Sequence, residues 1–161
     1  MITIDQLAEG FALNLRLMMM QSAGISHAES LIQTPYNINC LNWVLGHLAV
    51  NRDRVLLTIG EDPLLSEGEF DRYKTESDPI KEDGEDVIKL ERLLEILTDG
   101  QERINSGFSQ LTEARLFSLI QVGERQIQLG ERLHGFYFHD TYHTGQTDLL
   151  RQIAGTNDKI V

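Results

Sequence analysis

The sequence predicts an all-α protein in which four long helices form a bundle. Apolar residues recur every three to four positions along four long segments, and no stretch of useful length alternates between apolar and polar residues as a strand would. The chain has 161 residues, 41% of them hydrophobic, which is enough for one substantial core and too little for two. We therefore expect one helical domain that covers residues 1–161.

The first helix is expected to begin next to Thr3, because Thr3-Ile-Asp-Gln6 has the form of a capping box. Gly24 is a plausible stop for this helix. The run Met18-Met19-Met20 widens its apolar side beyond a single stripe. That width suits two interpretations, a flexible filling of the core or a second buried contact such as an oligomer interface.

A connection should follow over residues 24–37, where glycine, serine, proline and asparagine gather. We expect His27 to be a solvated residue of this loop. Asn39 can cap a second helix that runs to about residue 59. Gly60 then suits the position just past the last turn of that helix.

The second helix carries His47 on a broad apolar face that it shares with Trp43 and Val55. A lone histidine on such a face is normally a core residue with a satisfied hydrogen bond. Asn51, one turn further on, can either bind a ligand or satisfy a neighbouring backbone group. Cys40 lies two turns before His47, roughly 10 Å along the helix axis, which is too far to share a metal ion with it.

A long loop with a short helical turn is expected over residues 61–83, and long ordered loops often border functional sites. The third helix should run from Lys81 to Phe108, with its charged residues facing solvent. Residues 109–126 suit either an extended segment across the end of the bundle or an early start of the last helix, and we favour the extended segment. The last helix should run from near Gln128 to Ala154.

The strongest functional signal lies in this last helix. His139 and His143 are four residues apart, so both imidazoles lie on one helical face and can reach a single cation. The last helix runs on past this pair and is expected to end at Gly155. With His47 from a facing helix, three neutral imidazoles would form an incomplete ligand shell, as a catalytic metal site requires. The alternative is that all three are packing residues.

Two further residues of the last helix are candidates for supporting roles. Gln146 can orient the second ring nitrogen of His143, or it can be a buried contact between helices. Arg151 can attract an anionic group of a substrate, or it can pair with a local acid. Asp140 points about 100° away from His139 around the helix, so the helices offer no carboxylate base beside the predicted metal.

The composition excludes several classes of function. Fourteen Lys and Arg against 25 Asp and Glu give a formal charge of −11, so we expect neither nucleic-acid nor membrane-surface binding. The single cysteine excludes an intrachain disulfide. The N-terminus lacks the pattern of a secretory signal, and no apolar run approaches the roughly 20 residues of a membrane span. We therefore expect a cytoplasmic protein.

The motifs Trp43-Val-Leu-Gly-His47-Leu, His139-Asp-Thr-Tyr-His143-Thr-Gly-Gln146 and Leu150-Arg151-Gln-Ile-Ala-Gly155 are similar to those of the DinB-like superfamily. This superfamily includes the YfiT-type metal-dependent hydrolases, and the resemblance covers essentially the whole chain. It implies a four-helix up-down-down-up bundle, often a homodimer. It also implies a divalent metal, usually nickel or zinc, held by the three histidines. Characterised relatives include thiol transferases that use bacillithiol or mycothiol, and a mycothiol-dependent isomerase of maleylpyruvate.

The resemblance and the missing carboxylate base together favour one function. A divalent metal with open positions can lower the pKa of a water to about 7 or hold a thiol as its thiolate. Because activation of water usually requires a carboxylate base, we expect a metal-dependent transferase that uses a low-molecular-weight thiol and a small-molecule substrate. A metal-dependent hydrolase and a non-enzymatic metal-binding protein of the stress response are the alternatives.

Overall fold

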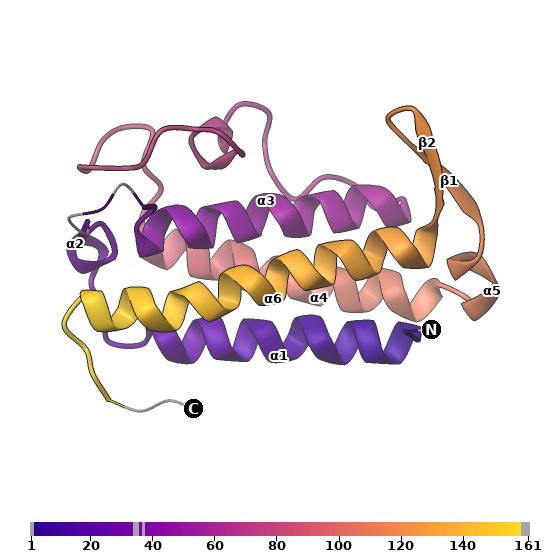
Figure 1. Cartoon of the computed structure of the whole chain (residues 1–161), viewed down its shortest axis with the longest axis horizontal. Coiled ribbons are helices and arrows are strands. Elements are labelled where there is room, and N and C mark those ends of the chain that lie inside the picture. Colours follow the sequence, from indigo (N-terminus) through magenta and orange to yellow (C-terminus); the bar gives the residue numbers. More distant parts are fainter. Residues whose placement is uncertain (1, 34–35, 37, 159–161) are drawn as a thin grey trace.

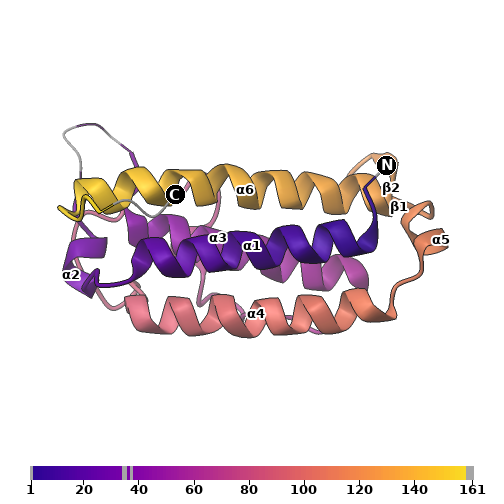
Figure 2. The same ribbon diagram turned by 90° about the horizontal axis from the view of Figure 1, so that it is seen from below.

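The computed structural model describes residues 2–33, 36 and 38–158, and this part of the chain is mainly α-helical. Four long helices lie lengthwise beside one another in both views (Figures 1 and 2), and α1 and α3 each pack against both α4 and α6. None of the described helices is long and apolar enough to cross a membrane. The elements are α1 (Ile4–Ser22), α2 (His27–Ser30), α3 (Leu41–Ile59), the 3-10 helix η1 (Asp71–Tyr73), α4 (Leu90–Gln110), α5 (Glu113–Leu116), β1 (Leu119–Val122), β2 (Arg125–Gln128) and α6 (Leu129–Ile153).

Predicted ends of three helices are found in the structure. The Thr3 hydroxyl accepts a hydrogen bond from the Gln6 backbone, and the Gln6 side chain accepts one from the Thr3 backbone, so the capping box is complete. Gly60 ends α3 in the left-handed conformation with φ 95°, which costs glycine little because it has no Cβ. The last helix also spans the predicted range, between caps at Gln128 and Ala154.

The start of α3 differs from the prediction. The residue at its N-cap is Cys40, which makes no side-chain capping bond, so Asn39 lies one position before the cap. The start of α4 differs more, because the helix begins at Leu90 and not at Lys81. The intervening residues include a run of acidic side chains around Gly84 with no apolar stripe, and such a stretch gains little by becoming a helix against the core. Positions 34, 35 and 37 of the predicted 24–37 connection lie outside the described residues.

The prediction that His27 is a solvated loop residue is wrong. His27 is the first residue of α2, and it caps α4 from a distant point in the chain. Its Nδ1 accepts a hydrogen bond from the backbone N–H of Leu90 at 3.2 Å, and its Nε2 lies 3.2 Å from Asp83. The N-cap residue of α4, Lys89, makes no side-chain capping bond of its own. An imidazole supplied by the start of α2 therefore takes over the role that a serine or aspartate normally plays at a helix start.

The segment between α4 and α6 is partly extended, as favoured. It contains the short helix α5 and then a hairpin in which Ile120 pairs with Ile127 and Val122 with Arg125. The hairpin stands at the end of the bundle where α4 ends and α6 begins (Figure 1). The sequence analysis did not predict these strands, because each has only four residues and a pattern that short carries no clear alternation.

One buried arginine joins the four long helices. Arg52 of α3 is fully buried and makes a two-pronged contact with Asp140 of α6, with 3.3 and 3.1 Å between the paired atoms. It also donates to the Gln101 side chain of α4 and to the backbone oxygen of Phe11 on α1. A buried charge is tolerated only when it is paired in this way, so the network fixes how the helices are aligned along one another.

The loop between α3 and α4 is anchored to α3 by Tyr73. The ring of Tyr73 is fully buried, and its hydroxyl donates to Asn42 of α3 and accepts from the backbone of Ile88. The ring also lies directly over Gly46. A Cβ at that position would be 2.1 Å from the Tyr73 ring, so only glycine fits beneath it.

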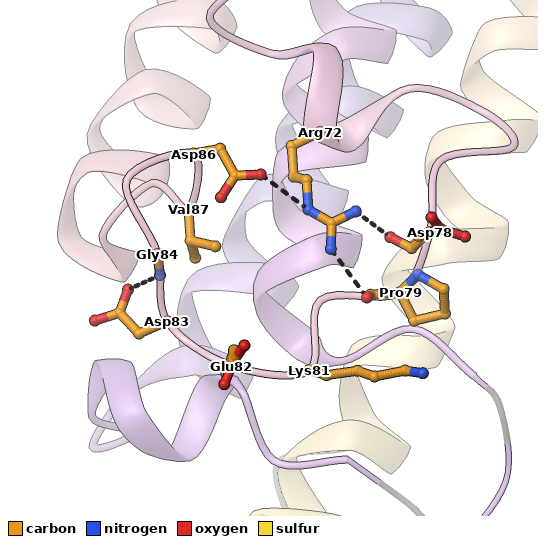
Figure 3. A pocket seen from close by; sticks show the side chains of 9 residues that line it. All are labelled: Arg72, Asp78, Pro79, Lys81, Glu82, Asp83, Gly84, Asp86 and Val87. Carbon is orange, nitrogen blue, oxygen red and sulfur yellow. Dashed lines mark hydrogen bonds and ion pairs between the residues drawn. The ribbon is translucent and has the colours of Figure 1, made fainter.

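A second anchor holds the far side of this loop. The guanidinium of Arg72 donates to the backbone oxygens of Asp78 and Pro79 and pairs with Asp86 at 3.3 Å (Figure 3). These contacts cross the pocket that Figure 3 draws and join the two ends of the loop segment 72–86. The two ends of segment 74–79 are therefore held in fixed positions beside α3.

Candidate metal centre

The structure brings the three predicted histidines to one point between α3 and α6. The Nε2 atoms of His47 and His139 are 3.1 Å apart, and one ring nitrogen from each of the three residues lies within 4.8 Å of the others. Nitrogen ligands at about 2.0–2.1 Å from a tetrahedral ion lie about 3.3 Å from one another. The spacing of His47 and His139 already matches a shared ion, and a small approach of His143 would complete the set.

Two of the imidazoles are held with their Nε2 lone pairs free. His47 donates from Nδ1 to the backbone oxygen of Tyr73 at 2.8 Å, and His143 donates from Nδ1 to the amide oxygen of Gln146 at 2.7 Å. Because both acceptors are carbonyl oxygens, the proton of each neutral ring must be on Nδ1. This is the arrangement by which proteins orient imidazole ligands and raise their basicity.

His139 leaves one polar atom of the site without a partner. Its Nδ1 is buried and has no hydrogen-bond partner among the described residues. A proton on Nδ1 would leave the Nε2 lone pairs of His139 and His47 facing each other, and a proton on Nε2 would leave Nδ1 as an unsatisfied buried acceptor. A cation shared between the two Nε2 atoms relieves the first arrangement, while the Nδ1–H of His139 keeps no hydrogen-bond partner among the described residues. The three residues therefore fit a metal ion.

Burial keeps the three rings neutral at pH 7. It is the largest cause of the lowered pKa of each ring, and the pKa of His139 falls to about 4. The neighbouring imidazoles lower the pKa of His139 further, because one positive ring would repel another. Neutral imidazole is the form that binds a metal, so no proton has to be displaced from the ligand nitrogens near neutral pH.

Trp43 lies against the site from one side. Its indole stacks on the His47 ring, with centroids 4.7 Å apart and planes at 13°, and its N–H donates to the Ser77 hydroxyl at 2.8 Å. The loop therefore contacts both the ring of His47, through Tyr73, and the residue stacked on it. Sequence reasoning did not predict Tyr73 and Ser77 as parts of the site. The only available signal was Gly46 inside a helix next to a candidate ligand.

Asn51 and Arg151 do not reach the histidine cluster. The Asn51 side chain donates to the backbone oxygen of Phe136 at 3.1 Å, which is the structural alternative for this residue. Arg151 is buried, donates to two backbone oxygens at the end of α1 and pairs with Asp158 at 2.9 Å. Arg151 thus has a local acid as its partner, which is the second of the two predicted roles, and it is not among the described residues that line the pocket beside the histidines.

A pocket of about 710 Å³ opens beside the histidines. Residues of α3 and α6 form two of its walls, and loop residues 75–77 form a third. Asp140 is not among the lining residues, since it is fully buried against Arg52. Among the described residues that line this pocket, Glu76 is the one carboxylate, and the sequence analysis did not anticipate it. The pocket in Figure 3, of about 640 Å³, is lined by loop residues only and contains none of the three histidines.

Comparison with known proteins supports the fold and leaves the family open. No protein-family model matches the sequence, and no curated protein matches it significantly. The chain is similar to a solved structure described as the crystal structure of the conserved protein of locus from Enterococcus faecalis, with a TM-score of 0.75 and 19% sequence identity. The similarity covers 97% of this chain and 99% of that chain, so the two share one fold over their whole described length.

Proposed function

We propose that this chain binds one divalent metal ion, nickel or zinc, through His47, His139 and His143. The observation that carries the proposal is the convergence of three neutral imidazoles, two of them oriented by carbonyl oxygens and the third with its Nε2 3.1 Å from the Nε2 of His47. Imidazole nitrogen suits both metals, and three protein ligands leave room for a further ligand from the pocket.

We also propose that the chain is a member of the DinB-like superfamily with an up-down-down-up bundle. The motifs around the three histidines support the membership. The arrangement is supported by the course of the chain in Figure 1, where α1 and α6 run from the hairpin end of the bundle and α3 and α4 run towards it.

The activity that we propose is transfer of a low-molecular-weight thiol to a small-molecule electrophile. A bound divalent ion would act as a Lewis acid that favours the thiolate form of such a thiol. The helices place no carboxylate at the histidines to serve as a base for water, because Asp140 is buried in an ion pair with Arg52. Glu76 lines the same pocket from the loop, where it is exposed to solvent. The absence of a helical carboxylate at the histidines supports a thiol over water as the nucleophile.

The metal is tested on protein purified without a histidine tag. Elemental analysis after loading with zinc or nickel should find one ion per chain, and titration should quench Trp43, the single tryptophan, because it stacks on His47. His139→Ala should weaken binding by at least about a hundredfold. His134→Ala is the matched control, since this exposed histidine of α6 lies outside the cluster. Equal affinity of the two variants would contradict the site.

The thiol reaction needs a separate assay. Metal-loaded protein is mixed with bacillithiol, mycothiol or glutathione and a chloronitrobenzene electrophile, with and without chelator. Conjugation that requires both the protein and the metal is the expected result. Metal binding without conjugation of any thiol would leave a non-enzymatic metal-binding protein as the function.

We further propose a homodimer that uses the outer face of α1 and α6. Its support is the set of large apolar side chains exposed on these two neighbouring helices, Leu13, Met20, Phe138 and Tyr142, which are 46% to 67% exposed. Light scattering after gel filtration should give twice the chain mass, and Phe138→Glu should give the single mass without loss of metal binding. A monomeric unmodified protein would contradict this proposal.

A further inference from the structure

We propose that the pocket beside the histidines takes a small molecule with an apolar body and a cationic amine, and that Glu76 selects for the amine. This inference rests on the proposed function, because it names the class of molecule that the same site accepts. It is carried by the charges that line the pocket, by the backbone conformation of Glu76, and by the contacts that hold the loop against α3.

The pocket contains one formal charge apart from the histidine rings. Of the described residues that line it, Glu76 is the only acidic one, and none is a lysine or arginine. The two arginines nearest in sequence to the pocket loop and the last helix, Arg72 and Arg151, are both engaged with carboxylates or backbone oxygens elsewhere. Lys74, two residues before Glu76, is paired with Asp71. Arg54 is close enough to lower the pKa of His47 and His139 but does not line the pocket. An anionic group placed near Glu76 would therefore meet repulsion with no lysine or arginine among the described lining residues, whereas a cation would gain a partner.

The backbone conformation at Glu76 indicates that a glutamate at this position is not required to form the turn. Glu76 has φ 70°, the left-handed conformation, and it is the only non-glycine residue with positive φ in the described part of the chain. The turn closes by a hydrogen bond from the Ser77 N–H to the Lys74 oxygen at 3.2 Å. A turn with positive φ at its third residue is most relaxed with glycine or asparagine. Unfavourable conformations of this kind persist where a side chain serves a function.

Contacts on both sides of the turn fix its position relative to the histidines. Before it, the backbone oxygen of Tyr73 accepts from His47, and the Tyr73 ring is locked over α3. After it, the Ser77 hydroxyl accepts from the Trp43 indole and donates to the Arg72 oxygen, both at 2.8 Å. The hydrogen bonds from Arg72 to the backbone oxygens of Asp78 and Pro79 hold the residues that follow (Figure 3). Glu76 is thus presented to the pocket by a backbone with little freedom.

The remaining walls define the rest of the ligand. The apolar lining includes Trp43, Val44 and Leu150, which are suited to an aromatic or aliphatic body of modest size. Glu76 is exposed at the mouth of the pocket, so the ion pair that it forms is partly screened by solvent. We therefore expect selection by charge that amounts to a factor of about five at low salt.

Three probes of equal shape and different charge test the inference: 2-phenylethylamine, 2-phenylethanol and phenylacetate. Each is titrated into the full chain at low ionic strength with excess chelator, and binding is followed by Trp43 fluorescence. The amine should bind about fivefold more tightly than phenylacetate, with the alcohol between them. In Glu76→Gln, this ratio should fall below twofold. Because no metal is present, the result is independent of whether the histidines bind one.

Glu82→Gln is the matched control. Glu82 is an exposed glutamate of the same loop that does not line this pocket, and its replacement changes the net charge of the protein by the same amount. The control should keep the fivefold preference. Equal loss in both variants would mean that the preference comes from the overall charge of −11 and would overturn the role of Glu76. Tighter binding of phenylacetate, or no binding of any probe, would overturn the ligand class.

Discussion

At the scale of single residues, the orientation of His47 depends on a contact from outside its helix. The oxygen that holds its Nδ1 belongs to Tyr73, 26 residues further along the chain. Tyr73 can supply it because its ring occupies the space that a side chain at position 46 would otherwise fill. The glycine beside the ligand, the aromatic ring of the loop and the tautomer of the imidazole are therefore parts of one arrangement.

Replacement of Gly46 should disturb this arrangement. In Gly46→Ala, the new methyl group would be 2.1 Å from the Tyr73 ring, so the ring and its two hydrogen bonds must move. We expect a loss of about 2–3 kcal/mol in the free energy of unfolding, measured by urea denaturation. Gly135→Ala on α6, where nothing lies within 4 Å of the added carbon, should instead be neutral or gain up to about 1 kcal/mol. Similar effects of the two changes would contradict the packing argument.

Gln146 should affect the metal and not the fold. Its amide oxygen accepts from His143 at 2.7 Å, and in Gln146→Leu that Nδ1–H would lose its acceptor while the side-chain volume stays similar. Removal of such a partner typically weakens metal affinity by about 10–100-fold. Competition with a chromophoric chelator measures this loss, and an unchanged melting temperature without metal is the control. Unchanged affinity would mean that Gln146 does not set the orientation of the ring.

At the scale of elements, α4 begins with help from two other segments. Its first N–H groups lack a local cap, and His27 supplies one from the start of α2, with its other ring nitrogen 3.2 Å from Asp83 of the long loop. Asp83 also accepts from Lys89 at 2.5 Å. These two donors lower the pKa of Asp83 to about 2, the lysine contributing most. The start of α4 is therefore decided by tertiary contacts and not by the local sequence.

This cap predicts a dependence of stability on pH. Because the pKa of Asp83 is lower in the folded protein than in the unfolded chain, its stabilisation is present above the unfolded pKa of about 3.9 and is lost as pH falls through about 2. Asp83→Asn should lower the melting temperature at pH 6, and the two melting curves should converge as pH approaches 2. Asp99→Asn, at an exposed position of α4, should follow the unmodified protein throughout. A constant gap between Asp83→Asn and the unmodified protein would contradict this account.

At the scale of the whole molecule, the charged network around Arg52 joins all four long helices in the interior. Its partners come from α1, α4 and α6. Asp140 follows His139 directly in α6 and points about 100° away from it, so the network and the candidate metal site share one helix. The contact that aligns α3 with α6 therefore also sets the distance between His47 and His139.

Removal of one member of this pair should be more damaging than removal of both. Arg52→Met would leave the carboxylate of Asp140 buried without its cation, at a cost of about 3–5 kcal/mol in the free energy of unfolding. The double variant Arg52→Met and Asp140→Leu should recover at least half of that loss, because no unpaired charge remains. Chemical denaturation of the two single variants and the double variant measures the coupling. Additive losses would contradict it.

Those residues of the candidate site that lie on helices could be predicted from the sequence. The spacing of His139 and His143 follows from helical geometry, and the apolar face around His47 directs it inwards, so three candidate ligands could be named without coordinates. The contributions of Tyr73, Ser77 and Glu76 could not, because a loop has no period from which the direction of a side chain follows. The absence of a carboxylate was judged from helices alone, which is why Glu76 was missed.

The sequence by itself determined the mainly helical class, the ends of α1 and α6, and the shared face of His139 and His143, since each follows from relations between residues a few positions apart. Only the tertiary structure decided the start of α4, the partners of Asn51 and Arg151, and the loop that completes the pocket. These depend on groups that are distant in the chain and meet only when the core packs. Local spacing carries no information about such meetings, because any of several partners could satisfy the same buried polar group.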